Sequence, residues 1–144
     1  MIGIIITGHG NFATGLKSSL ELIIGEQARL EAVDFLADES TTKLRTKLNA
    51  AVSKLGTEEG LVFFSDLVGG SPFKTSVLVA KDIEDSEVLA GTNLPMIMDI
   101  LFARDKLSPA ELKSKALSAA ESGIDAFNFN NQSKKEKQGS ANKL

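Results

Sequence analysis

The sequence predicts an α/β fold: one three-layer domain in which a mostly parallel sheet of four or five strands lies between two layers of helices. Three observations support this prediction. The 144 residues suit a single domain. Short apolar runs alternate along the chain with longer segments of helical periodicity. The strongest runs carry apolar side chains on both alternations, which indicates burial on both faces, as in a parallel sheet.

Five segments have strand character. Residues 2–7 are mostly β-branched and stop abruptly at a glycine-flanked histidine, His9. Residues 60–67 repeat the apolar pattern until Asp66 interrupts it. The predicted strands are residues 2–7, 30–36, 60–67, 87–92 and 124–129.

The segments between these strands have apolar residues at helical spacing. In the first interval Phe12, Leu16 and Leu20 recur at helical spacing, which favours packing of Phe12 into the core over exposure at a docking rim. Ser40 is the predicted N-cap of the second helix. The predicted helices are residues 12–24, 40–55, 71–81, 95–104 and 109–123.

Two helix starts combine a capping serine with a proline at the first helical position. Ser71-Pro72 predicts the start of the third helix, with Ser71 as its N-cap. Ser108-Pro109 predicts the start of the last helix, and Glu111 stands at the capping-box position.

Alternation of strands and helices predicts right-handed crossovers and a parallel sheet. For a chain of this length the flavodoxin-like strand order 2-1-3-4 is favoured over the six-stranded dinucleotide-binding order. Strands one and three are then neighbours at the topological switch point, where ligands bind beyond the carboxyl ends of the strands. His9 and the turn that follows Asp66 are therefore expected to meet at one crevice.

Composition excludes several function classes. The net charge of −3 gives no electrostatic support for binding nucleic acid. With no cysteine, the chain has no disulfide, thiolate nucleophile or zinc–thiolate site, which fits a reducing cytoplasm. No apolar stretch approaches a membrane span, and we expect no signal peptide. With one histidine and no carboxylate cluster on the crevice loops, we expect no metal and no cofactor.

The C-terminal composition differs from the rest. Residues 130–144 are polar, lysine-rich and without periodicity, which predicts a disordered tail after a folded domain of residues 1–129.

His9 is the candidate catalytic residue, because a lone imidazole between two glycines at a strand tip is little shielded. Asp66 is the expected partner; its alternative role is to cap or form a turn. A carboxylate that accepts a hydrogen bond from one ring nitrogen fixes the tautomer and leaves the other nitrogen with an exposed lone pair.

A glycine-rich turn follows Asp66. Gly69, Gly70 and Ser71 lead into a helix N-terminus, whose free N–H groups and dipole can bind an anion, although an ordinary capped helix has the same sequence features. A nucleophilic nitrogen, an orienting carboxylate and an anion cradle together indicate acceptance of a phosphoryl group on histidine. Because no Walker A sequence is present, the expected donor is another protein.

Two alternatives remain. Residues 8–13 match G-x-G-x-x-A between a strand and a helix, the dinucleotide fingerprint, with Asp34 or Asp38 placed to bind a ribose hydroxyl. A non-enzymatic regulatory or scaffold domain is the other alternative.

Three motifs occur in order along the chain: IIITGHGNFATGL, FFSDLVGGSPF and AGTNLPM. Together they resemble the enzyme IIA component of the mannose family of sugar phosphotransferase systems (mannose, fructose, sorbose and N-acetylgalactosamine), over residues 1–129. The resemblance implies that His9 is the phosphorylated residue and Asp66 its orienting aspartate. It also implies that the loop of Leu67, Val68, Gly69, Gly70 and Ser71 contacts the phosphoryl group.

The resemblance further implies a cytoplasmic phosphotransferase that accepts its phosphoryl group from the phosphocarrier HPr. The group then passes to a IIB component, which phosphorylates sugar during import through the membrane components IIC and IID. Members are homodimers that commonly exchange the final, antiparallel edge strand, a role that residues 124–129 would fill. A variant phosphorylated as a signal would share the same site.

This chain departs from the family pattern in its loop and its length. Leu67 and Val68 stand where some relatives carry a polar residue and an aromatic one, which leaves contacts with the phosphoryl group to backbone groups and Ser71. Some relatives continue into a fused IIB domain, so this chain is expected to act as a free-standing IIA. Asn93 and Pro95 are expected to shape a loop near the crevice or to line the partner surface.

Overall fold

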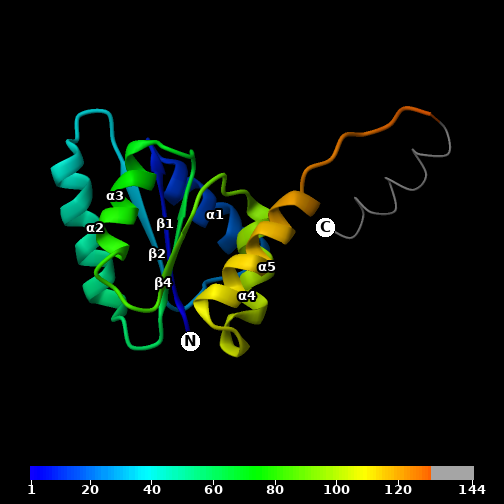
Figure 1. Ribbon diagram of the computed structural model, residues 1–144. Coiled ribbons are helices and arrows are strands. Elements are labelled where there is room, and N and C mark those ends of the chain that lie inside the picture. Colours follow the sequence, from blue (N-terminus) through cyan, green and yellow to red (C-terminus); the bar gives the residue numbers. More distant parts are fainter. Residues whose placement is uncertain (131–144) are drawn as a thin grey trace.

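The structure, a computed structural model, describes residues 1–130, and the predicted tail lies almost wholly outside them. Four parallel strands form one sheet in the predicted order β2-β1-β3-β4 (Figure 1). The strands are β1 (Gly3–His9), β2 (Leu30–Phe35), β3 (Leu61–Ser65) and β4 (Ser86–Leu89). The predicted α/β class and strand order are therefore confirmed.

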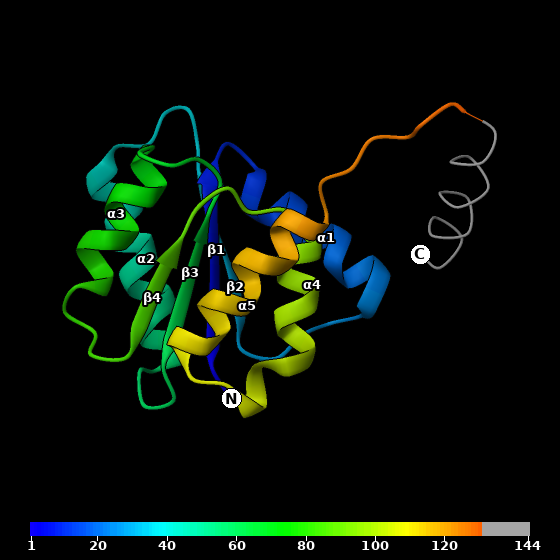
Figure 2. The same cartoon turned by 45° about the vertical axis from the view of Figure 1, so that its right-hand side comes forward.

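Helices cover both faces of this sheet, which gives the three layers (Figures 1 and 2). The helices are α1 (Phe12–Ile24), α2 (Thr41–Leu55), α3 (Ser71–Ala80), α4 (Leu94–Ala103) and α5 (Pro109–Ser122), with a short 3₁₀ turn η1 (Arg104–Lys106). Helices α2 and α3 lie on one face, and α1, α4 and α5 on the other.

Two apolar clusters fill the spaces between the layers. Along β1 the side chains alternate between them: Ile4 and Ile6 pack beneath α1, α4 and α5, whereas Ile5 packs beneath α2 and α3. The central strands are buried on both faces, as predicted for a parallel sheet. Phe12 packs against the first cluster, so its helical spacing correctly favoured the core.

Helix starts follow the predicted chemistry in two cases, and the expectation that Asn93 shapes its loop is confirmed as well. The Ser40 hydroxyl accepts a hydrogen bond from the Lys43 amide, 3.1 Å away. Ser108 and Glu111 form the predicted capping box at α5. Asn93 shapes its loop, because its carboxamide oxygen accepts from the Met96 amide at 3.0 Å and caps α4.

The start of α3 was predicted wrongly. The N-cap of α3 is Gly70, and Ser71 is the first residue of the helix rather than its cap. The Gly70 amide donates to the Leu67 carbonyl at 3.1 Å, so a turn leads directly into the helix. No side chain caps α3.

Strand boundaries differ from the predictions in all four strands; β3, for example, spans Leu61–Ser65 rather than residues 60–67. Three differences are larger or bear on the site. Strand β1 continues through His9, so the histidine is the last residue of a strand rather than part of a turn. Strand β4 begins one residue earlier than predicted and ends at Leu89 rather than residue 92. Residues 124–129 form no strand within this chain and run outward from the end of α5 (Figure 2). Their apolar side chains are exposed, because the chain's own sheet does not cover them.

The opposite, amino-terminal end of the sheet is closed by a buried arginine. Arg104 is 3% exposed, and its guanidinium donates to the backbone carbonyls of Ile2, Ala28 and Arg29. This end of the sheet is closed by packing, which leaves the carboxyl ends of the strands as the open edge.

Candidate functional site

His9 stands at the carboxyl end of β1, between the ends of β2 and β3. Its side chain is 46% exposed. Gly10 follows in a left-handed conformation, with φ of +57°, so the chain leaves the strand sharply and enters α1 two residues later. The imidazole therefore lies at an open edge of a rigid sheet.

Asp66, immediately after β3, binds His9 twice. Its Oδ2 atom accepts hydrogen bonds from the His9 backbone amide and from ring Nδ1, both at 2.9 Å. The loop carrying Asp66 is held in turn by the next loop: Gly91 N–H donates to the Asp66 carbonyl, and the Thr92 hydroxyl to the Ser65 carbonyl. The predicted His–Asp pair is therefore formed.

The carboxyl of Asp66 is held in its charged form. Partial burial acts to raise the pKa of Asp66, but hydrogen bonds from the His9 backbone and ring, aided by the Leu67 amide, lower it below its ordinary value. A carboxylate at Asp66 requires a proton on His9 Nδ1, so ring Nε2 carries the lone pair.

The imidazole lies directly against the N-terminus of α3. A Cβ atom placed on Gly70 would be 2.8 Å from His9 Cε1 and 3.5 Å from Nε2. A side chain at this position would force the His9 ring to move. The unprotonated nitrogen thus lies beside a helix N-terminus that no side chain caps.

The remaining predicted site residues form the turn between Asp66 and α3. Gly69 has φ of +78°, and Ser71 opens the helix. Leu67 and Val68 are 59% and 74% exposed, so this turn presents two apolar residues to solvent. The arrangement offers a nucleophilic nitrogen, an orienting carboxylate and an open anion-binding helix end.

Two residues at the end of β2 were assigned no part in the histidine site by the sequence analysis. The Phe35 ring makes an edge contact with the His9 ring, with centroids 5.9 Å apart. Asp34 binds Thr14 through both carboxylate oxygens. The Asp34 carboxylate is therefore engaged with Thr14, whereas Asp38, the other residue that the dinucleotide alternative names, is exposed in the turn after β2.

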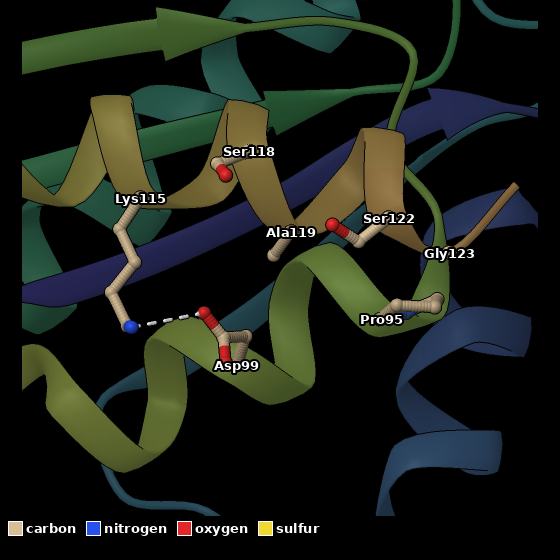
Figure 3. A pocket seen from close by; sticks show the side chains of 7 residues that line it. All are labelled: Pro95, Asp99, Lys115, Ser118, Ala119, Ser122 and Gly123. Atoms are coloured by element: carbon tan, nitrogen blue, oxygen red, sulfur yellow. Dashed lines mark ion pairs between the residues drawn. The ribbon is translucent and has the colours of Figure 1, made fainter. Parts of the chain in front are cut away.

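One pocket belongs to a different part of the molecule. It has a volume of about 450 Å³ and lies between α4 and α5, where Asp99 and Lys115 form an ion pair at 3.2 Å (Figure 3). Its lining includes neither His9 nor Asp66. Across residues 1–130, no three His, Cys, Asp or Glu side chains gather as a metal site. None of the described helices has the length and apolar character to cross a membrane.

Comparison with known families matches residues 3–117 to the family described as the PTS (phosphotransferase system) fructose IIA component. The mannose-specific EIIAB component of Escherichia coli K12 is 38% identical over 128 residues, which cover 88% of this chain and 39% of that protein. This chain thus spans about two-fifths of the length of that relative. The fructose-specific EIIA component of Bacillus subtilis is 33% identical over 112 residues, which cover 78% of this chain and 77% of that protein.

Solved structures agree with the sequence comparison. A phosphotransferase EIIA component from Streptococcus agalactiae superposes with a TM-score of 0.82 at 34% identity, covering 88% of this chain and 98% of its own. A mannose/sorbose-specific IIA subunit from Enterococcus faecalis has a TM-score of 0.81 at 22% identity, covering 89% of this chain and 96% of its own, and shows the shared fold.

Proposed function

Because the chain belongs to the PTS fructose IIA component family, we propose that it is a phosphocarrier that accepts a phosphoryl group from HPr on His9 and delivers it to a IIB component. Membership places the chain in sugar phosphotransfer; the two partners and the acceptor residue are the proposal. The observation that carries it is the position of His9, bound by Asp66 on one side and facing the uncapped N-terminus of α3 on the other.

In this proposal Nε2 is the atom that is phosphorylated. Nδ1 donates its proton to Asp66, so the lone pair on Nε2 is free to attack phosphorus. The bond from Nε2 to phosphorus forms as the bond from phosphorus to the donor breaks, and no proton has to leave the ring. The imidazole becomes cationic, and the Asp66 carboxylate stabilises that charge.

In this proposal the N-terminus of α3 stabilises the negative charge of the phosphoryl group during transfer. The backbone N–H of Ser71, the first residue of α3, is available at the helix end that the His9 ring faces, with the Ser71 hydroxyl as a further donor; the Gly70 amide is already bonded to the Leu67 carbonyl. Leu67 and Val68 expose apolar side chains, so their contribution is a surface for docking a protein rather than side-chain contacts with phosphate. An open site of this kind suits transfer between two protein surfaces.

We also propose that the chain works in the cytoplasm as a homodimer that exchanges residues 124–129. The support is the family resemblance together with the exposure of Ile124 and Phe129, which are 75% and 76% accessible in the single chain. Burial of these side chains by a second copy would remove an apolar surface from water. Sedimentation of the chain with and without residues 124–144 tests this, and an unchanged dimer after truncation would contradict the exchange.

The test of the phosphocarrier proposal is intact mass spectrometry. The protein is incubated with phosphoenolpyruvate, enzyme I and HPr, as wild type and as His9→Gln. We expect one acid-labile phosphoryl group on the wild type only, and its loss on addition of a IIB component. A wild type that gains no phosphoryl group from active HPr would overturn the proposal.

Retention of the group in the presence of every IIB component tested would favour the regulatory alternative, in which phosphorylation acts as a signal. An equal gain in His9→Gln would place the acceptor elsewhere in the chain.

A further inference from the structure

The end of β2 holds the His9 segment from the side opposite Asp66. In the parallel pairing of β1 with β2, His9 stands directly beside Phe35. The Phe35 carbonyl accepts a hydrogen bond from Gly10 N–H at 2.7 Å, and the Phe35 ring meets the imidazole at an interplanar angle of 62°. Phe35 thus contacts both the ring of His9 and the backbone that follows it.

Asp34 holds the next part of the same segment. Its carboxylate accepts from the Thr14 amide at 3.0 Å and from the Thr14 hydroxyl at 2.7 Å. The N-cap residue of α1, Asn11, provides no side-chain cap, so Asp34 satisfies a first-turn amide of α1 from a neighbouring strand. The turn from His9 to Thr14 is therefore fastened to β2 at both ends.

The end of β2 is itself anchored. Lys47 on α2 donates to the Asp34 carbonyl at 2.6 Å and pairs with Glu39 at 2.9 Å. Glu39 in turn accepts from the Leu36 amide at 2.8 Å. These contacts tie the strand end to α2, so it can act as a fixed support.

A fixed support matters because Asp66 restrains only one atom of the imidazole. A half-exposed ring held at Nδ1 alone can still tilt and move Nε2 away from the N-terminus of α3. An edge contact with a second ring restrains the tilt. Misplacement of a reacting atom by about 1 Å costs on the order of a hundredfold in rate.

We propose that Phe35 and Asp34 are positioning residues for His9: the Phe35 ring sets the tilt of the imidazole, and Asp34 fixes the turn that follows it. This inference rests on the proposed phosphoryl transfer. It assigns no contact with the phosphoryl group to either residue. It adds the end of β2 to a site otherwise built from β1, β3 and α3.

The first test replaces Phe35 with leucine, which keeps an apolar side chain against the core but removes the aromatic edge. We expect transfer from phospho-HPr to fall about tenfold in kcat, with KM within about twofold of wild type, because docking residues are untouched. Phe102→Leu is the matched control, since Phe102 is 76% exposed on α4 and belongs to the other helical layer.

A second readout does not depend on phosphorylation. The nuclear Overhauser effect between the His9 ring proton on Cε1 and the Gly70 Hα atoms reports the tilt of the ring, and we expect a strong signal in wild type and a weakened one in Phe35→Leu. Failure of the wild type to accept phosphate would overturn the proposed function but leave this measurement intact. An unchanged Overhauser signal to Gly70 and unchanged kcat in folded Phe35→Leu would overturn the positioning role.

The Asp34 contact is tested by a double-mutant cycle with Thr14. Asp34→Asn and Thr14→Val each remove part of the contact without a large change in volume. We expect each to lower kcat about threefold to tenfold, and the double variant to lose little more than the larger single effect. Additive losses, or equal losses in Asp38→Asn, would show that Asp34 does not act through Thr14.

Discussion

Helices α3 and α5 both begin at a Ser-Pro dipeptide, yet their N-termini serve different purposes. At α5 the serine lies outside the helix as N-cap and forms a capping box with Glu111. At α3 the serine lies inside the helix, Gly70 takes the cap position, and no side chain satisfies the first-turn amides. The α5 end is thus closed by its own side chains, while the α3 end is left open beside His9.

Under the proposed function, this difference separates a helix start that stabilises the fold from one that is left open for an anion. A satisfied helix start stabilises the fold, typically by about 1 kcal/mol. An unsatisfied start forgoes that stabilisation but keeps N–H groups available for an anion. Four changes would break or sharpen the comparison, and we give them in order of expected effect.

The largest effect is expected from Gly70→Ala. The backbone of Gly70 has φ of −73°, which alanine adopts freely, so the added methyl group acts only through its collision with the His9 ring. We expect phosphorylation of His9 to fall at least about a hundredfold, with the free energy of unfolding nearly unchanged. Stopped-flow transfer from phospho-HPr and urea unfolding measure the two quantities.

Gly15→Ala is the control for this variant, because a Cβ atom at Gly15 meets no atom within 4 Å. Full activity in Gly70→Ala would show that the ring does not need its present position against α3.

Ser71→Ala tests the contribution of one hydroxyl at the open helix start. Because Ser71 does not cap α3, its removal is expected to leave stability within about 0.5 kcal/mol. Loss of one hydrogen bond to a charged group predicts a drop in transfer rate of about tenfold. A large loss of stability with normal transfer would mean that Ser71 serves the helix after all.

Ser108→Ala makes the opposite change at α5. We expect the free energy of unfolding to fall by about 1 kcal/mol, because the Glu111 amide loses its acceptor at 3.2 Å. Transfer from phospho-HPr is expected to stay normal. Urea unfolding followed by circular dichroism measures the loss of unfolding free energy. Reduced transfer at unchanged protein concentration would contradict the assignment of α5 to stability and α3 to transfer.

Glu111→Gln is expected to have the smallest effect, visible only in the dependence of stability on pH. Hydrogen bonds from the backbone and side chain of Ser108 lower the pKa of Glu111 in the folded protein. Its stabilisation is therefore complete above the unfolded pKa and is lost as the pH falls through the lowered value. Between about pH 5 and pH 2, the free energy of unfolding should change less with pH in the variant than in wild type.

Much of the site was predictable because its parts are strongly local signals. His9 between two glycines at a strand end, and Asp66 followed by a glycine turn, indicate a site without any knowledge of the fold. Their meeting follows from the strand order, since β1 and β3 are neighbours. The Nδ1–Oδ2 distance of 2.9 Å confirms that expectation.

The support from β2 was not predictable in the same way. Phe35 looks like an ordinary strand residue, and its place beside His9 depends on the register of β1 against β2. A register shift by one residue would turn Phe35 toward the other face of the sheet, and no local pattern specifies the register. The sequence analysis placed Asp34 near a ribose because local sequence does not reveal its partner: Thr14 lies 20 residues away along the chain.

Residues 124–129 mark another limit of local patterns. Alternating apolar and polar side chains predict a strand, but a strand also needs a partner edge. No strand of residues 1–130 pairs with this segment, and Ile124, Phe127 and Phe129 are exposed.

Local patterns were thus enough for the class of fold, the strand order, most helix starts and the His9–Asp66 pair, because apolar periodicity and turn residues act over a few neighbours. The two Ser-Pro starts show what such patterns lack. The same dipeptide caps α5 but lies inside α3, where the His9 ring packs against Gly70 at the N-cap position. That difference arises from the packing of β1 against α3, a contact between residues about 60 positions apart, which only the folded chain can specify.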